Sequence, residues 1–255
     1  MKQVDLNCDL GESFGNYTCG LDAEVIPHIS SANVACGFHA SDPLVMMKTV
    51  ALAKRYGVSV GAHPGYPDLV GFGRRNMTVS PVELKAMVQY QIGALQAFCK
   101  AQGVALRHVK PHGAMYNMAA KDRKLADAIC EAIGEVDSSL ILLGLSGSQM
   151  LEAAKETGLP WGSEVFADRA YKDDGSLTPR ALPGSVITDE EEAIARVLQM
   201  VQEGTVTARS GKTIPIQADS ICLHGDGVKA VEFARRIRAE LTAAGVEIVP
   251  LAALR

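Results

Sequence analysis

The sequence, 255 residues long, has no hydrophobic run that could cross a membrane, because nowhere do about eighteen apolar residues follow one another. Its first residues, MKQVDLNCDL, also lack the apolar core of a secretory signal. Both absences argue against membrane insertion and against export. We therefore expect a cytoplasmic protein that does not bind a membrane.

Excess positive charge is missing as well. The chain has 25 lysine and arginine residues against 29 aspartate and glutamate residues, which gives a formal net charge of -4. No basic stripe interrupts this balance, whereas binding to a nucleic-acid backbone requires a basic face. We therefore expect no nucleic-acid partner.

Closely spaced cysteine pairs are absent, and such pairs are the usual sign of a zinc site or a disulfide framework. Several of the cysteines lie inside apolar segments, where a reduced thiol packs as a small hydrophobic group. We expect buried thiols at these positions. The six cysteines are Cys8, Cys19, Cys36, Cys99, Cys130 and Cys222.

A complete nucleotide-binding loop is also missing. The segment SGKT, residues 210–213, resembles the end of a P-loop. However, Val206 occupies the position that requires the first glycine, and Pro215 would break the helix that should follow. We therefore reject this segment as a phosphate-binding loop.

Linkers, composition shifts and internal repeats are not found, so we expect residues 1–255 to form one domain. The sequence does contain a regular alternation of short apolar runs with helical segments. The predicted strands are 4–9, 31–36, 58–63, 106–112, 139–145, 161–167 and 220–226, with a possible eighth at 246–251.

Helix boundary signals lie between these strands. The segments 42–57 and 80–103 both open on a capping residue followed by proline and both end on glycine. Two further helices are predicted to end at Gly204 and Gly245. Such alternation indicates parallel strands joined by crossover helices, either in an open sheet or in a closed barrel.

The pattern within the strands favours the barrel. In the first strand Asp5, Asn7 and Asp9 share one face, while three apolar residues share the other. Buried parallel strands are normally apolar on both faces, and an open sheet covered by helices would have to bury these charges. We therefore predict an α/β fold, a (β/α) barrel of seven, possibly eight, mostly parallel strands with its site at their carboxyl ends.

Ionisable side chains fall at those predicted carboxyl ends. Asp9 ends the first strand, His63 the third and His112 the fourth, while His224 and Asp226 end the last. A single histidine is more often a packed structural residue than a catalyst. These three histidines, however, adjoin proline or glycine in AHPG, KPHG and LHGD, which turn the backbone at the rim of the barrel. We predict that they form a site.

Loops beyond the strands add candidates. Gly37 permits a turn after the second strand that would place His39 above the same rim, whereas Asp42 is explained as a helix cap. The role of Asn33 stays open. The glycine-rich segment GAHPGYPDLVGFGRR ends in Arg74 and Arg75, whose guanidinium groups could bind a carboxylate or a phosphate.

The segment EVFADRAYKDDGSLTPR follows the sixth strand and is long enough to fold over a site. A charged loop of this kind is as often simply solvated. We give most weight to Glu164, Asp168 and Arg169 because of their position at the carboxyl end of the strand.

Six blocks occur in the chain in this order: DLNCDLGESFG, ANVACGFHASDP, GAHPGYPDLVGFGRR, VKPHGAMYN, EVFADRAY and CLHGD. In these blocks the sequence resembles the LamB/YcsF family over nearly its whole length. One departure is Ser41 in HASD, where HAGD is common in the family, and it affects only the local loop geometry.

The resemblance implies a distorted barrel of the glycoside hydrolase/deacetylase type. It also implies ATP-dependent opening of 5-oxoproline to L-glutamate in a complex with two further subunits, B and C. ATP would then be bound by this chain or by those partners.

This chemistry suggests roles for the candidate residues. Asp9, His63 and His112 would activate water, directly or as the ligands of a divalent metal. Lys110 would stabilise oxyanion charge, and His39 or His224 would protonate the departing amine. We assign substrate binding to Asn7, Glu12, Asn33, Arg74, Arg75, Asn117, Glu164, Asp168, Arg169 and Asp226.

Two other functions stay open at this stage. Related barrels include metal-dependent hydrolases that remove acyl groups from sugars, and fold likeness cannot separate these from a lactam hydrolase. The chain could also be a non-catalytic, substrate-binding subunit. The density of ionisable residues at the strand ends argues against that last alternative.

Overall fold

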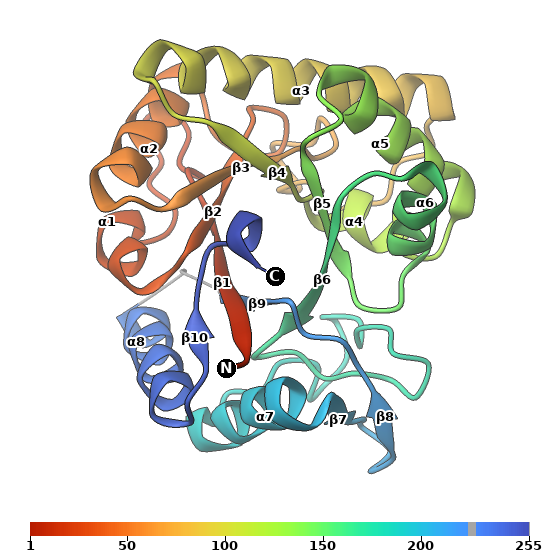
Figure 1. Cartoon of the computed structure of the whole chain (residues 1–255). Coiled ribbons are helices and arrows are strands. Elements are labelled where there is room, and N and C mark those ends of the chain that lie inside the picture. Colours follow the sequence, from red (N-terminus) through yellow and green to blue (C-terminus); the bar gives the residue numbers. More distant parts are fainter. Residues whose placement is uncertain (224–227, 255) are drawn as a thin grey trace.

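The computed structural model describes residues 1–223 and 228–254 and is built around a closed ring of parallel strands (Figure 1). β1 pairs with β2 on one edge and with β9 on the other, which closes the ring. The predicted barrel is confirmed. Its seven strands are β1 (Gln3–Leu10), β2 (Ser31–Ala35), β3 (Ser59–His63), β4 (Leu106–Val109), β5 (Ile141–Leu145), β6 (Trp161–Phe166) and β9 (Ser220–Leu223).

The possible eighth strand does not join this ring. Of residues 246–251 only β10 (Glu247–Ile248) is a strand, and it pairs with the first two residues of β1. The chain then enters η2 (Leu251–Ala253), which lies across the N-terminal end of the barrel (Figure 1). There the backbone N–H of Leu251 donates to Ser31 Oγ at 3.3 Å. This segment therefore closes the end of the barrel opposite to the predicted site.

The predicted strand ends differ from the structure mainly at β4 and β9. β4 ends at Val109 rather than at residue 112, because Pro111 has no N–H for a ladder and His112 already precedes a helix. β9 is described only to Leu223. His224 and Asp226, two predicted site residues, lie outside the described residues.

Helices surround the barrel and cover the outer faces of its strands (Figure 1). The predicted caps are present: Asp42 Oδ1 accepts the backbone N–H of Leu44 at 2.8 Å, and Gly57 ends that helix with a φ of 68°. The helices are α1 (Asp22–Val25), η1 (Ile26–His28), α2 (Pro43–Tyr56), α3 (Pro81–Gln102), α4 (Gly113–Ala119), α5 (Arg123–Val136), α6 (Gln149–Thr157), α7 (Glu190–Glu203) and α8 (Val228–Ala243).

An antiparallel hairpin of β7 (Thr205–Thr207) and β8 (Thr213–Pro215) was not predicted. Its strands are three residues each, too short to show a period in the sequence. The segment SGKT, residues 210–213, forms the turn and the start of β8. It therefore precedes a strand and not a helix, which agrees with its rejection as a P-loop.

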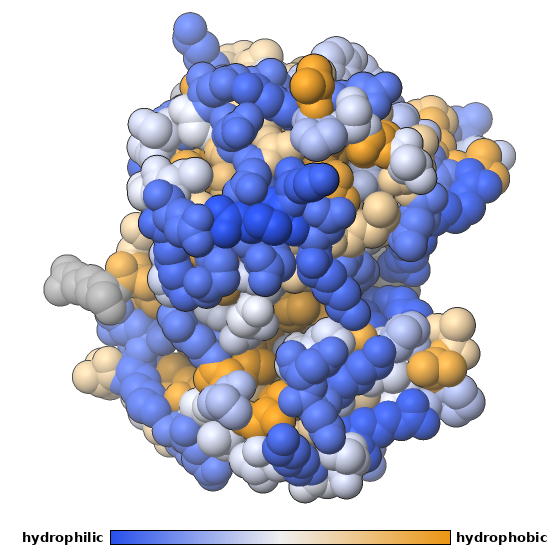
Figure 2. Space-filling model, turned by 90° about the vertical axis from the view of Figure 1, so that its right-hand side faces the viewer, coloured by the Kyte–Doolittle hydropathy of each residue, from blue (hydrophilic) through white to orange (hydrophobic). Residues whose placement is uncertain are grey.

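The two faces of the barrel strands differ as their alternation predicted. Val4, Leu6 and Cys8 are fully buried toward the helices, while polar side chains fill the interior. All six cysteines are free thiols, and only Cys19 is not fully buried. In the described residues no helix has the length and apolarity needed to span a membrane. The face that carries α5 and α6 is mainly hydrophilic, with apolar residues in a hollow (Figure 2).

Candidate active site

Polar side chains form a continuous column through the barrel, and its lowest member is Asp5. Asp5 Oδ1 accepts hydrogen bonds from the hydroxyls of Ser30 and Ser31, both at 2.7 Å, and Oδ2 accepts one from Ser220 at 2.5 Å. Burial raises the pKa of Asp5 to about 6, although the three hydroxyls act in the opposite direction. Every oxygen of this carboxylate therefore has a partner.

Lys110 occupies the middle of the column. Its Nζ lies 2.9 Å from Asp9 Oδ1 and 2.8 Å from Glu164 Oε1, and Asn7 Oδ1 and Cys222 Sγ are each 3.2 Å away. Burial alone would lower the pKa of Lys110, but Asp9, with Cys222 and Glu164, holds it well above its usual value. The ammonium therefore stays charged and its three N–H groups are engaged. This geometry makes Lys110 a positioning residue for Asp9.

Two amides and a histidine connect the column to β4. Asn33 Nδ2 donates to Asn7 Oδ1 and Asp9 Oδ1, both at 2.8 Å, and Asn33 Oδ1 accepts from His108 Nε2 at 2.7 Å. A Cβ at Gly61 would lie 2.1 Å from the His108 ring, so only glycine fits there. Asn7 and Asn33, predicted to bind substrate, are not among the residues that line the pocket. Asn33 orients Asp9 directly, and Asn7 does so through Asn33 and Lys110.

His63 and His112 meet at the upper rim of the barrel. The Nδ1 of His63 lies 2.6 Å from the carbonyl oxygen of Lys110, and the Nε2 of His112 lies 2.8 Å from that of Phe72. A carbonyl only accepts, so each of these nitrogens carries the proton. The opposite nitrogens, Nε2 of His63 and Nδ1 of His112, face each other at 3.0 Å. Asp9 Oδ2 lies 3.2 Å from the same Nε2.

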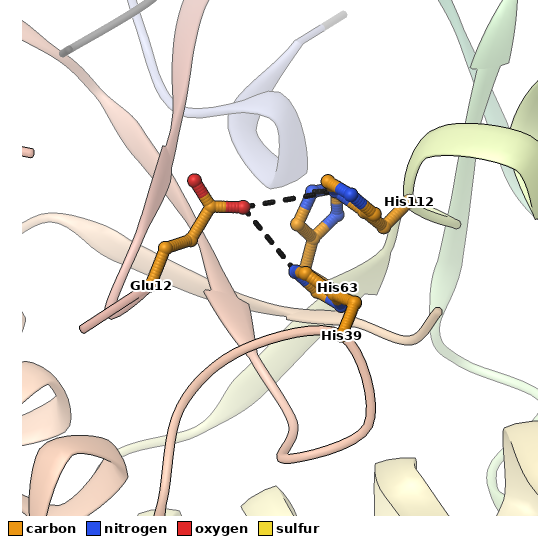
Figure 3. A group of neighbouring side chains, drawn as sticks. All are labelled: Glu12, His39, His63 and His112. Atoms are coloured by element: carbon orange, nitrogen blue, oxygen red, sulfur yellow. Dashed lines mark hydrogen bonds and ion pairs between the residues drawn. The ribbon is translucent and has the colours of Figure 1, made fainter. Parts of the chain in front are cut away.

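Glu12 and His39 complete this group (Figure 3). Glu12 Oε1 lies 3.2 Å from His39 Nε2 and 3.7 Å from His112 Nδ1. The rings of His39 and His112 are stacked, with centroids 3.7 Å apart and an interplanar angle of 3°. A Cβ at Gly65 would lie 2.7 Å from His39 Nδ1, and one at Gly73 2.6 Å from His39 Cβ. The glycines of GAHPGYPDLVGFGRR therefore make room for the imidazole stack.

The charge state of these groups follows from their burial. Burial, with the neighbouring histidines, lowers the pKa of His112 to about 3 and that of His39 well below its usual value. Burial raises the pKa of Asp9, but the charges of His63 and Lys110 outweigh this effect and hold that pKa well below its ordinary range. At neutral pH the rim therefore presents an ionised Asp9 beside neutral imidazoles of His39 and His112.

A pocket of about 560 Å³ opens above this group. Asp9, Glu12, His63, Lys110 and His112 line its floor. The other lining residues include four cations, an amide and a phenol: Arg74, Lys121, Arg169, Arg180, Asn117 and Tyr116. The pocket therefore combines ionisable groups at one end with positive charge suited to an anionic ligand.

Some sequence-predicted residues lie outside this pocket. Arg75, predicted to bind substrate, does not line the pocket, and its Nε donates to Asp68 Oδ1 at 3.0 Å. Glu164 is fully buried between Lys110 and the hydroxyl of Tyr116, which donates to Glu164 Oε2 at 2.6 Å. Asp168 is not among the lining residues.

Tyr116 and Phe72 are functional candidates that the sequence analysis missed. Tyr116 lies on α4, four residues after His112 at the N-cap of that helix, and this spacing of about one helical turn offered a usable signal. Phe72 acts through its backbone carbonyl and has a φ of 54°, unusual for a residue with a side chain. A hydrogen bond to a backbone carbonyl can be made at any residue, so the sequence could not predict it.

Known proteins resemble the chain over its full length. The family model described as LamB/YcsF matches residues 4–255. The A subunit of 5-oxoprolinase from Clostridium beijerinckii is 66% identical over 251 residues, which are 98% of each chain. The crystal structure of the lactam utilization protein from Thermus thermophilus has a TM-score of 0.92 and 51% identity, covering 97% of this chain and 99% of that one.

A more distant likeness concerns the fold alone. The structure of T48 deacetylase with substrate has a TM-score of 0.51 at 14% identity, and the match covers 99% of this chain and 90% of the other. The expected glycoside hydrolase/deacetylase type of barrel is thereby confirmed.

Proposed function

Since the chain belongs to the LamB/YcsF family, we propose that it hydrolyses 5-oxoproline to L-glutamate in an ATP-dependent reaction as the A subunit of a multi-subunit 5-oxoprolinase. Relatives named as the A subunit of that enzyme match nearly the whole chain at 54% and 66% identity. The observation that carries the proposal is the pairing of an ionised Asp9 with His63 on the floor of a pocket with cationic walls.

The lactam needs activation because a five-membered cyclic amide is stable. In our proposal the carbonyl oxygen is phosphorylated at the expense of ATP, which makes the ring carbon electrophilic. Water then attacks that carbon, and the ring C–N bond breaks to free the amine and leave an acyl phosphate. A second water hydrolyses the acyl phosphate to a carboxylate and releases phosphate. The products are L-glutamate, ADP and phosphate.

The residues of the pocket have defined tasks in this scheme. Asp9 and His63, which lie 3.2 Å apart and both line the pocket, activate the attacking water, and Asp9 accepts its proton. Arg74 and Arg169 bind the substrate carboxylate or the phosphate. Asp9 then returns the proton of the water to the departing amine.

We assign the binding of ATP to the partner subunits B and C. The one P-loop-like segment of this chain leads into β8 and not into a helix, so it has no helix N-terminus for a phosphate. This chain alone should therefore release no glutamate from 5-oxoproline.

The test is ATP-coupled glutamate release by the purified chain, alone and mixed with candidate partner subunits. We expect activity only in the complete mixture, and its loss when this chain is omitted or carries His63→Asn. No release of glutamate from any combination would contradict the proposal. Cleavage of acetylated sugars without ATP would instead support a carbohydrate deacetylase. Full activity after replacement of Asp9, His63 and His112 by alanine would support a non-catalytic role.

A further inference from the structure

We infer that the rim of the barrel binds one divalent transition-metal ion, such as Zn²⁺, through Glu12, His63 and His112. Among the described residues, these three and His39 have ligand atoms that all lie within 4.8 Å of one another. The inference goes beyond lactam cleavage, because it concerns ion binding by this chain in isolation.

The direction of the imidazole lone pairs is the first argument. The carbonyls of Lys110 and Phe72 hold the protons on the far nitrogens of His63 and His112. Nε2 of His63 and Nδ1 of His112, 3.0 Å apart, then carry lone pairs that point toward each other. The planes of the two rings are at 90°. Two facing lone pairs repel unless a cation lies between them, either an extra proton or a metal ion.

The distances suit a metal ion. Donor atoms about 2.1 Å from one ion are separated by roughly 3.0–3.4 Å at angles between about 90° and 109°. The His63–His112 separation is 3.0 Å, and Glu12 Oε1, on a rotatable side chain, lies 3.7 Å from His112 Nδ1. Two imidazoles and one carboxylate favour a transition ion over Mg²⁺ or Ca²⁺, which take oxygen donors.

Each of the three ligands also has a supporting hydrogen bond. Carbonyl groups orient the two imidazoles, and His39 Nε2 lies 3.2 Å from the Glu12 carboxylate, to which it donates. Such outer contacts are typical of metal ligands. The open side of the group faces the pocket, which Glu12, His63 and His112 all line. A bound ion there would polarise a carbonyl oxygen or lower the pKa of a bound water.

His39 is assigned a supporting role by its orientation. Its ring is parallel to that of His112 at 3.7 Å, so an ion in the plane of one ring lies outside the plane of the other. His39 is also absent from the pocket lining. We leave Asp9 out of the ligand set, since its Oδ1 is held by Lys110 and Asn33 and its Oδ2 contacts His63 alone among the described imidazoles. This set differs from Asp9, His63 and His112, which the sequence predicts.

The experiment is a metal titration of the isolated full-length chain, without partner subunits, ATP or substrate. After dialysis against a chelator, Co²⁺ is added while its visible absorption is recorded, and Zn²⁺ affinity is obtained by competition. We expect one ion per chain and d–d bands that saturate at that ratio. Absence of stoichiometric binding by the wild-type chain would overturn the inference and leave lactam cleavage untouched.

Matched variants identify the ligands. His63→Asn retains an amide N–H near the position of Nδ1 and His112→Gln one near Nε2, so each keeps its carbonyl contact and loses only the inward nitrogen. With Glu12→Gln, each should weaken binding by at least about 100-fold. Wild-type affinity in His63→Asn and His112→Gln would show that the two imidazoles share a proton instead.

His39→Phe preserves the stack on His112 and removes the donor to Glu12. We expect affinity to fall about 10- to 100-fold with one ion still bound. Complete loss of binding in this variant would overturn the supporting role of His39. His28→Asn, on η1 and outside the site, is the control and should bind as the wild type does.

Discussion

The two ends of the polar column differ in how completely their groups are satisfied. At the lower end, around Asp5, three hydroxyls saturate the carboxylate and η2 covers that end of the barrel. At the rim, His63, His112 and Glu12 direct acceptor atoms toward one another and toward an open pocket.

This difference distinguishes polar side chains that stabilise the fold from polar side chains that bind a ligand. Buried polar groups normally find their partners within the fold, so a saturated cluster such as that of Asp5 requires no ligand. Two acceptors that face each other, such as Nε2 of His63 and Nδ1 of His112, indicate a cation supplied from outside. Backbone strain has the same distribution: Ser41 and Phe72, the non-glycine residues with positive φ in the described part of the chain, both lie in rim loops.

The largest effect that would sharpen this contrast is expected for His63→Asn. Loss of the inward nitrogen should reduce glutamate release by the reconstituted enzyme about 10²- to 10⁴-fold. Stability should change little, by less than about 2 kcal/mol, because the bond to the Lys110 carbonyl is retained. The pair of measurements is the steady-state rate and urea unfolding. A strongly destabilised variant with a normal rate would place His63 with the structural groups.

Lys110 lies in the middle of the polar column, between the Asp5 end and the rim, and Lys110→Met tests its contribution to stability. Removal of the ammonium leaves Asp9 and Glu164 buried without their shared cation, which should cost about 3–5 kcal/mol in unfolding free energy. The control is Lys85→Met on the surface, paired with Glu135, where a much smaller loss is expected because solvent screens an exposed ion pair. Equal losses in urea unfolding would show that the column is not held together by Lys110.

Asp5 links the lower region to pH. Its pKa is about 6 in the folded chain, against 3.8 for an ordinary aspartate, so the folded state keeps its proton over a pH range in which the unfolded state has lost it. Its contribution is therefore most favourable below about pH 4 and declines by about 3 kcal/mol as pH rises to about 6, at about 1.4 kcal/mol per pKa unit.

Asp5→Asn cannot ionise and isolates this contribution. The unfolding free energy of the wild type minus that of the variant, measured in urea from pH 4 to pH 7, should fall as pH rises. Parallel stability curves for the two proteins would mean that Asp5 titrates normally in the fold.

The smallest effect concerns rim strain at Ser41. With a φ of 74°, this residue should gain about 0.5 kcal/mol on Ser41→Gly, after allowance for the greater freedom of glycine in the unfolded chain. Ser41→Ala, which keeps the Cβ, is the control and should show no gain in Tm. A Tm that falls in the glycine variant would mean that the side chain, and not the backbone, stabilises this loop.

Much of the fold could be predicted because polar and apolar residues alternate along the barrel strands. Asp5, Asn7 and Asp9 alternate with apolar residues, and that alternation distinguished a barrel with a polar interior from an open sheet. The β7–β8 hairpin and the fate of residues 246–251 escaped prediction, because strands of two or three residues are too short to show an alternation. β10 also owes its pairing to β1, at the other end of the sequence.

The candidate site divides in the same way. His63 and His112 were predicted from their position at strand ends, and they do meet. Arg75 was indistinguishable from Arg74 in the sequence, but Asp68 holds one and the pocket receives the other. The partners of a long flexible side chain depend on which groups the folded loops bring within reach.

Strand alternation and strand direction are local properties of the chain, so the amino-acid order sets which side chains point into the barrel and at which end they gather. Which nitrogen of each imidazole faces inward follows from the folded arrangement alone. That choice depends on the backbone carbonyls of Lys110 and Phe72, and carbonyls are common to every residue. Their position is set by the closed barrel and by the path of its loops.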